Sequence, residues 1–251
     1  MSSNLSQPER RWHQLQQQLV DCRQCSRLIA YGQDVAKTKR KSFEDQIYWG
    51  RPVPNFGDAP ASLLVVGLAP AAHGAHRTGR MFTGDQSGRW LYRALHRFGF
   101  AETEAWEQKD DNRLIDTIIT AVAHCAPPDN KPAREEIQNC SRYLDATLEH
   151  SQARAILCLG KIAWDAIAAR TQRSSVPRQT NERRKVPAFA HGASYLTTQI
   201  GSRPTSETFV IGSYHPSQQN TFTGRLTEVM FDEIFGKLRE KLTEDPNNRA
   251  P

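Results

Sequence analysis

The residues best suited to chemistry lie in segments rich in glycine, histidine and small polar side chains. The longest runs from Gly67 to Asp85 (GLAPAAHGAHRTGRMFTGD) and holds two histidines, two arginines and one carboxylate. Its glycines let the backbone turn sharply and approach a ligand closely. The segment matches neither the dinucleotide-binding pattern G-x-G-x-x-G nor the phosphate-binding pattern G-x-x-x-x-G-K-S/T. A loop of this length is usually functional, with a purely structural loop as the alternative.

A second segment runs from Ser213 to Asn220 (SYHPSQQN) and continues to Thr223-Gly224-Arg225. Its backbone N–H groups and hydroxyls suit contacts with phosphate. A lone histidine is more often structural than reactive. His215, however, stands at the end of a predicted strand, and ligands bind beyond the carboxyl ends of strands in open parallel sheets. This position favours a functional role for His215.

A third segment, from His124 to Pro132 (HCAPPDNKP), carries an asparagine in a loop stiffened by prolines. An amide offers a hydrogen-bond donor and an acceptor together. Asn130 is therefore a candidate for reading the edge of a pyrimidine. The alternative is that Asn130 only caps the helix that follows.

Four of the five cysteines form two pairs that suit a metal centre. Cys22 and Cys25 make a C-x-x-C pair, while Cys125 and Cys140 are separated by fourteen residues. Together they can hold one tetrahedral metal ion or an iron–sulfur cluster. Disulfides are not expected in a chain of this kind. Cys158 lies inside an apolar run and is assigned to the core.

Apolar runs alternate with amphipathic stretches along most of the chain. The runs predict buried strands within 62–68, 114–123, 154–159 and 208–213. The stretches predict helices over 8–21, 87–98, 133–150, 161–169 and 226–242. This alternation indicates an α/β fold, with a mostly parallel sheet between two layers of helices. The three segments described above each follow one of the predicted strands.

Other stretches fall outside this alternation. Lys37 to Lys41 (KTKRK) is expected to be a solvated loop, with a phosphate contact as the alternative. Arg170 to Lys185 is polar, rich in arginine and aperiodic, so we expect a mobile insertion. The tail from Glu244 to Pro251 is expected to be disordered. The chain shows no internal repeat, and residues 1–251 are expected to form one domain.

The composition favours a polyanionic partner. The net charge is +6 over 251 residues, and lysine and arginine release counterions from a phosphate backbone. No apolar run approaches the roughly 20 residues needed to span a bilayer. The polar start of the chain carries no signal peptide. We therefore expect a cytoplasmic protein that does not enter membranes.

The segments GLAPAAHGAHRTGRMFTGDQSG and SYHPSQQNTFTGRLT closely resemble the two signature segments of the type-b, or family 5, uracil-DNA glycosylases. CAPPDNKP and the four-cysteine pattern fit the same family, and the resemblance extends from Cys22 to the last predicted helix. It implies a three-layer α/β/α fold with a central four-stranded parallel sheet. It also implies a 4Fe-4S cluster on Cys22, Cys25, Cys125 and Cys140.

The resemblance also implies an activity, a partner and a set of site residues. Family members excise uracil, and often other deaminated or modified bases, from single- and double-stranded DNA, which initiates base excision repair. A match residue by residue makes Asp85 and His215 the catalytic candidates. Candidates for binding the base are Gly67, Leu68, Ala69, Phe82 and Asn130, and candidates for binding DNA are Ser217, Gln219 and Arg225.

Several alternatives stay open at this stage. Asp85 precedes a predicted helix, so it is either an N-cap, a catalytic carboxylate or both. Phe82 either stacks on a base or fills the core. Many relatives in the wider superfamily place a polar residue directly after the first strand, whereas Leu68 to Ala72 contains none.

The function has alternatives too. A non-catalytic iron–sulfur module that binds nucleic acid would share this fold and charge. A nucleotide or cofactor enzyme is disfavoured, because its glycine patterns are missing. We expect a monomer associated with the nucleoid.

Overall fold

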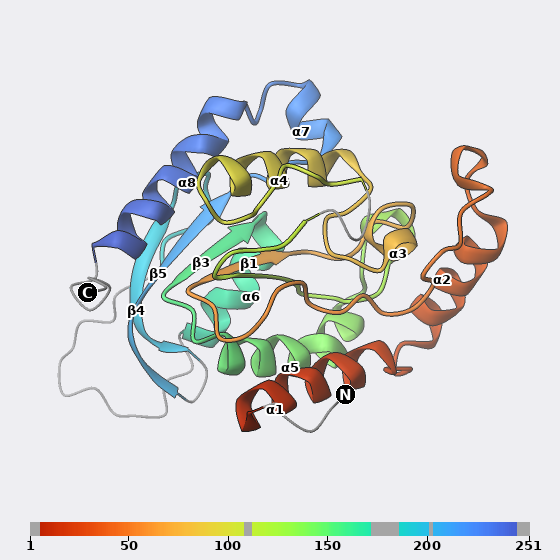
Figure 1. Cartoon of the computed structure of the whole chain (residues 1–251), viewed down its shortest axis with the longest axis horizontal. Coiled ribbons are helices and arrows are strands. Elements are labelled where there is room, and N and C mark those ends of the chain that lie inside the picture. Colours follow the sequence, from red (N-terminus) through yellow and green to blue (C-terminus); the bar gives the residue numbers. More distant parts are fainter. Residues whose placement is uncertain (1–5, 108–111, 172–185, 201–202, 245–251) are drawn as a thin grey trace.

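Five strands form one twisted sheet in the order β2-β1-β3-β5-β4 in the computed structural model, which describes residues 6–107, 112–171, 186–200 and 203–244 (Figure 1). β1 (Leu63–Gly67), β2 (Thr117–Ala121), β3 (Ala155–Leu159) and β5 (Arg203–Ser213) run parallel. β4 (Ser194–Ile200) pairs with β5 in the antiparallel direction and lies at the edge of the sheet. The strand order places β1 and β3 side by side at its centre.

The central strands are buried on both faces, as their continuous apolar sequences predict. Every residue of β1, β2 and β3 is buried. Successive side chains of a strand point to opposite faces. Leu63 and Val65 accordingly pack into one hydrophobic cluster, and Leu64 and Val66 pack into another on the far side of the sheet. The sheet therefore separates two cores.

Helices cover both faces and complete three layers (Figure 1). One face carries α4 (Gln86–Arg97) and α8 (Glu228–Thr243), and the other carries α1 (Gln7–Val20), α5 (Arg134–Ser151) and α6 (Lys161–Thr171). These five helices confirm the predicted ones to within about two residues at each end, which is the usual uncertainty of helix boundaries.

The other helices of the described residues are α2 (Ser26–Thr38) and several short ones. The short ones are the 3₁₀ helix η1 (Lys41–Phe43), α3 (Ala75–Thr78), the 3₁₀ helix η2 (Pro128–Asn130) and α7 (Gln218–Phe222). None of the described helices is long and apolar enough to cross a membrane.

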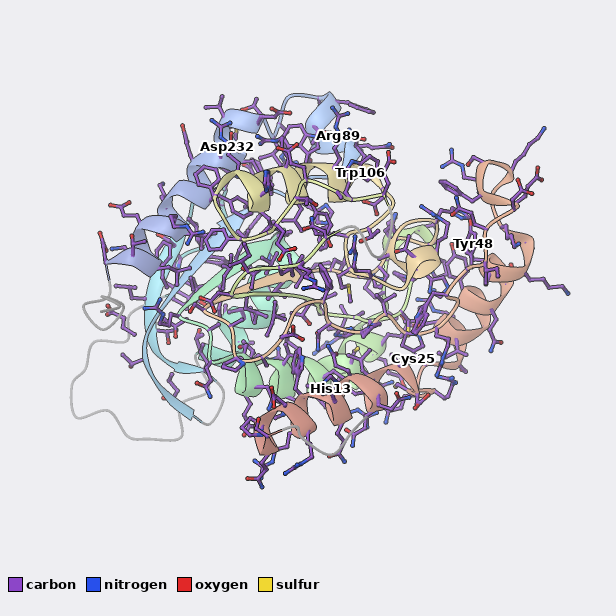
Figure 2. The ribbon with its side chains drawn as sticks, in the orientation of Figure 1. His13, Cys25, Tyr48, Arg89, Trp106 and Asp232 are labelled. Atoms are coloured by element: carbon purple, nitrogen blue, oxygen red, sulfur yellow. The ribbon has the colours of Figure 1, made fainter. Side chains whose placement is uncertain are left out.

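Ion pairs fasten α4 to α8. The side chain of Asp232 on α8, which Figure 2 labels, is only 14% exposed. It accepts from Arg93 Nη2 and from Arg97 Nη1, each at 2.7 Å. A mostly buried carboxylate shared by two guanidinium groups of one helix fixes how that helix lies on its neighbour. α4 is thereby held as a rigid support for the loop at its N-terminus.

The expected four-stranded, all-parallel sheet is corrected to five strands by β4. This strand mixes exposed and buried positions and pairs on one side only. Its sequence, SYLTTQI, has no continuous apolar run, so it lacks the signal that marks the central strands. The expected loop from Lys37 to Lys41 is also wrong in part, because Lys37 lies in α2 and Lys41 begins η1.

The boundaries of the expected insertion and tail shift as well. Arg170 belongs to the last turn of α6, where its Nε contacts Asp145 Oδ1 at 2.5 Å. Residues 172–185 of the insertion lie outside the described residues. Glu244 ends α8 as its C-cap, and the rest of the tail, 245–251, also lies outside the described residues.

Candidate active site

The carboxyl ends of β1 and β3 form a switch point in the topology. The chain passes from β1 to β2 on one side and then crosses to β3 on the other side of β1. In open α/β sheets ligands bind in the crevice that such a reversal creates. The loop from Leu68 to Asp85 begins at this point, and the segment that follows β5 ends beside it. Both segments singled out in the sequence thus meet at one edge of the sheet.

Phe82 and His215 are the side chains that join these two segments. Their rings stack with centroids 5.8 Å apart and planes inclined by 29°. Phe82 also covers the end of β1, since a Cβ atom on Gly67 would lie 2.9 Å from its Cε2 atom. His215 lies over the end of β3. A Cβ atom added at Gly160 would lie 3.7 Å from the Cβ atom of His215, which is an ordinary contact distance. These contacts bring Gly67, Phe82 and His215 together at one end of the sheet.

The backbone at Phe82 has a left-handed conformation, with φ of +56°. For a bulky side chain this conformation costs of order 1–3 kcal/mol and persists only where neighbours enforce it. Tyr92 enforces it by donating its hydroxyl to Met81 O at 2.8 Å, and Arg80 does so by donating Nε to Thr83 Oγ1 at 2.8 Å. Strain of this kind clusters at ligand sites.

Asp85 lies at the N-terminus of α4 and caps it. Its Oδ1 accepts from Gly88 N at 3.0 Å. Burial raises the pKa of the Asp85 carboxyl above its ordinary value, and the N–H groups of Gly88 and Ser87 and the Arg77 guanidinium partly offset that rise. The capping role is confirmed, and the catalytic role stays a prediction that capping does not exclude. A Cβ atom on Gly74 would overlap Asp85 Oδ2, so α3 begins in direct contact with this carboxylate.

Arg77 supports the turn that leads into Asp85, and sequence reasoning did not single it out. Its side chain donates Nη2 to Gly84 O at 3.1 Å and Nε to His73 O at 2.7 Å. Its guanidinium also lies 4.0 Å from the ring centroid of Phe43 in η1. On the other side of the turn, Gly84 N donates to Trp106 O at 2.7 Å. Trp106 is labelled near the N-terminal end of α4 in Figure 2.

His215 is held as a neutral imidazole. Burial lowers its pKa to about 4. Its backbone carbonyl accepts from Asn220 Nδ2 at 2.9 Å, which ties the histidine to α7. At neutral pH the ring is therefore an uncharged donor or acceptor rather than a cation.

The predicted DNA-binding residues follow His215 in and beside α7. Ser217 caps α7 through its hydroxyl, which accepts from Asn220 N at 3.5 Å. Gln219 and Arg225 are exposed. The Arg225 guanidinium lies 4.7 Å from the ring centroid of Tyr214. These side chains form the outer edge of the candidate site.

Leu68 and Ala69 directly follow β1 and are partly exposed. Leu68 O accepts from Ala123 N at 2.9 Å, which joins this loop to the one after β2.

Asn130 lies further out than expected. It is exposed, with φ of +55°, on the 3₁₀ helix η2. Within the described residues, no hydrogen bond links its side chain to Asp85 or His215. It is not the cap of α5, because Ala133 is the N-cap and its N–H donates to Glu136 Oε2 at 2.7 Å. The capping alternative is therefore wrong, and the role in base recognition stays a prediction.

The four paired cysteines surround one cavity between α1, α2, α5 and the loop after β2. Cys22, Cys25, Cys125 and Cys140 all line it, beside apolar groups such as Leu19 and Leu28. Figure 2 labels Cys25 near the junction of α1 and α2. All five cysteines are free, and Cys158 is buried in β3 as expected.

Electrostatics around this cavity disfavour bare thiolates. Burial raises the pKa of Cys140 to about 12 and also raises the pKa of Cys125 and Cys25, and neighbouring cysteines add to each rise. Two donors on α5 face the sulfur atoms, Asn139 Nδ2 at 3.7 Å from Cys25 Sγ and Arg142 Nη2 at 3.7 Å from Cys22 Sγ. Among the residues that the structure describes, no three histidine, cysteine or acidic side chains are grouped closely enough to hold a metal ion.

Comparisons with known proteins agree with this geometry. A family model described as the uracil DNA glycosylase superfamily matches residues 54–239. The type-5 uracil-DNA glycosylase of Mycobacterium leprae is 46% identical over 225 residues, which cover 88% of this chain and 92% of that protein. The type-5 uracil-DNA glycosylase of Thermus thermophilus is 42% identical over 220 residues, which cover 87% of this chain and 93% of that protein. The chain belongs to the uracil DNA glycosylase superfamily.

Proposed function

We propose that this protein is a type-5 uracil-DNA glycosylase that hydrolyses the N-glycosidic bond of uracil, and of other deaminated or modified bases, flipped out of DNA. The observation that carries the proposal is the stacking of Phe82 on His215 at the switch point of the sheet, in the loop that ends where Asp85 caps α4. Similarity to type-5 enzymes over most of the chain supports it. Excision of the base would initiate base excision repair. We further propose that the enzyme acts as a monomer on chromosomal DNA in the cytoplasm.

The target base must leave the duplex before it can react. Extrusion costs a few kcal/mol, and less for a mispaired or damaged base. Stacking on an aromatic ring stabilises the extruded base by roughly 1–3 kcal/mol. Phe82 supplies that ring, and His215 covers part of it. A base then takes the face of Phe82 that His215 leaves free, and Asn130 approaches from η2 to read its edge.

Cleavage of the bond separates charge. The sugar develops cationic character and the departing base takes up negative charge, as in glycoside hydrolysis. The Asp85 carboxylate stabilises the sugar cation and orients the attacking water. A neutral His215 donates a hydrogen bond to the base oxygen, with the backbone N–H groups from Gly67 to Ala69 as further donors. Fixed donors aimed at developing charge need no rearrangement during the reaction.

DNA outside the pocket is held by its phosphates. Ser217, Gln219 and Arg225 lie on the outer edge of the site and offer a hydroxyl, an amide and a guanidinium. Such groups set the register of the duplex without reading its sequence. Binding should therefore weaken as the salt concentration rises.

We also propose that Cys22, Cys25, Cys125 and Cys140 hold a 4Fe-4S cluster. A bound cluster would supply positive iron beside the thiolates and so offset the raised pKa values of Cys25, Cys125 and Cys140. The four cysteines line one cavity, which is the observation that supports a shared centre. The cysteines would then tie α1 and α2 to α5 and to the loop after β2. Zinc is the alternative, and iron analysis separates the two.

The excision of uracil is the direct test of the proposed function. Single-turnover assays on single- and double-stranded DNA should release free uracil and leave an abasic site. A panel that includes hypoxanthine, xanthine, hydroxymethyluracil and ethenocytosine then defines the lesion range. Tight binding of uracil-containing DNA without release of any base would instead establish the non-catalytic alternative.

Asp85→Asn and His215→Ala should each lower the single-turnover excision rate by about a hundredfold or more, because each removes a group aimed at developing charge. Asparagine caps helices as well as aspartate does, so Asp85→Asn should keep the thermal stability of the wild type. The matched control is Asp145→Asn on α5, where the side chain is 55% exposed. Near-normal rates in either site variant would remove that residue from the chemistry.

Titration of Asp85 and His215 should lower the excision rate only on the acid side of the pH profile. The active form needs an anionic Asp85, whose pKa is raised, and a neutral His215, whose pKa is lowered to about 4. The rate should therefore fall as the pH drops through the raised pKa of Asp85 and then towards 4. An inflection near the ordinary histidine pKa of about 6.5 that persists in Asp85→Asn would show that His215 protonates too readily for this role.

Gly67→Ala should lower the excision rate roughly tenfold, the order of one base–aromatic stack. The added Cβ lies 2.9 Å from Phe82 Cε2 and must displace the ring. In a Phe82→Leu background the same change should have little further effect, because the ring edge is gone. Gly236→Ala on α8 is the control, since its Cβ meets Phe98 at an ordinary 3.8 Å. Additive losses in the double variant would contradict the contact as the cause.

Cys125→Ser should lower the iron content and the absorbance at about 400 nm typical of iron–sulfur proteins, together with the midpoint of thermal unfolding. Cys158→Ala should keep both the iron and the colour, because Cys158 lies in β3 away from the cavity. Iron and sulfide analysis of the purified wild type is the companion measurement. A colourless wild type with one zinc per chain would replace the cluster with a single ion.

A further inference from the structure

His191 clamps the segment that carries His215, although it belongs to a different part of the chain. It lies in the turn that leads into the edge strand β4. Its Nδ1 atom is 3.2 Å from Tyr214 N, and its Nε2 atom is 3.2 Å from Met230 O on α8. The imidazole therefore bridges the end of β5 to α8, immediately before His215.

The two backbone partners fix the protonation of this ring. Tyr214 N–H can only donate, so Nδ1 must be the acceptor. The carbonyl of Met230 can only accept, so Nε2 must carry the hydrogen. Ser213 Oγ lies 3.4 Å from Nδ1 but is 2.9 Å from Tyr214 O, to which it donates. His191 is thus required as one neutral tautomer.

Packing around the Tyr214 ring also restrains the segment that His191 holds. The rings of His191 and Phe189 lie 5.1 and 6.2 Å from the Tyr214 ring, and the Arg225 guanidinium lies 4.7 Å from its centroid. Phe189 in turn packs against Trp164 on α6 at 6.2 Å. The residue before His215 is thereby surrounded on several sides, while Asn220 holds the His215 carbonyl itself.

We propose that His191 is a positioning residue for His215, acting through the backbone of Tyr214. The inference rests on the proposed function insofar as His215 contacts the base. Loss of the clamp lets the peptide between Ser213 and His215 rotate, which moves the imidazole away from the base oxygen. Misplacement of a reacting group by about 1 Å can cost about a hundredfold in rate. Binding of DNA, which depends on phosphate contacts, is left unchanged.

Three substitutions test the acceptor and the donor of the His191 ring separately. Asparagine places Oδ1 at the same number of bonds from Cα as Nδ1, so His191→Asn keeps the acceptor for Tyr214 N–H. His191→Gln keeps only a donor in reach of Met230 O, and His191→Ala keeps neither. We expect His191→Ala and His191→Gln to lower the single-turnover rate roughly 10- to 100-fold, and His191→Asn to stay within a few fold of the wild type. His13→Ala is the matched control, an exposed histidine on α1 labelled in Figure 2.

A readout independent of activity tests the clamp itself. The Tyr214 amide should be protected from hydrogen exchange in the wild type and in His191→Asn, and should exchange faster in the other two variants. The nitrogen resonances of His191 should report a neutral ring with the proton on Nε2. Equal rates and equal protection in all three variants would overturn the proposal.

The two failures remain distinguishable. If the wild type excises no base, the proposed function falls, while the exchange data still decide whether His191 clamps Tyr214. If the wild type excises uracil and all three variants lose activity alike, including His191→Asn, the acceptor role is wrong. Loss of activity in parallel with lost thermal stability would likewise make His191 merely structural.

Discussion

The loop after β1 must lie in direct contact with the ends of the strands, and this contact is the constraint on which the site depends. Phe82 can cover β1 only because Gly67 has no side chain at that point. The carbonyl of Phe82 in turn occupies the space that a side chain on Gly88 would need in the first turn of α4. A loop pinned in this way to a strand end and a helix start cannot slide. Its one carboxylate, Asp85, is thus fixed relative to the sheet.

The same compactness sets the charges of the reactive groups. Burial disfavours the ionised form of each side chain, because it removes water from the charge. The pKa of Asp85 is therefore raised and the pKa of His215 is lowered. Asp85 is compensated by the N–H groups at the start of α4 and by Arg77, whereas among the described residues burial alone acts on the pKa of His215. The site therefore holds a carboxyl group whose charge is partly compensated and an imidazole that favours its neutral form. An ionised carboxylate and a neutral donor are the pair that the proposed cleavage into a sugar cation and a base anion needs.

The sequence was sufficient for the central layers and for the segments that carry reactive groups, because both have local signals. Four buried strands and five helices follow from apolar runs and helical periodicity. The segments that carry Asp85, Phe82 and His215 stood out through glycine-rich and proline-containing motifs next to strand ends, whereas the roles expected of these residues came from the family resemblance. β4 escaped prediction because an edge strand pairs on one side and needs no continuous apolar run. α2 escaped because Gly32 stands in the buried stripe between Leu28 and Val35, where a side chain would collide with His76.

The supports of the site escaped prediction for a different reason. Arg77 and His191 contact backbone carbonyl and amide groups, which every residue offers alike. Some of these groups lie far away in the sequence. Such partners leave no pattern in a sequence, because the backbone is the same at every position. Asn130 shows the converse case, since a strong local motif did not bring its side chain into hydrogen-bonding contact with Asp85 or His215. Spatial convergence depends on the whole fold, whereas a motif reports only its own loop.

α2 extends this argument to the cysteine cavity. Cys25 forms the N-cap of α2, and two turns later Gly32 O is 3.0 Å from Nε2 of the buried His76 on α3. The backbone of α3 then accepts from Gly50 N and Trp49 N, just beyond η1. Hydrogen bonds therefore join the segment that begins at Cys25 to the loop that ends at Asp85. Any bond that fixes the sulfur atoms also limits how far α2 can shift, and with it the helix against which Asp85 rests.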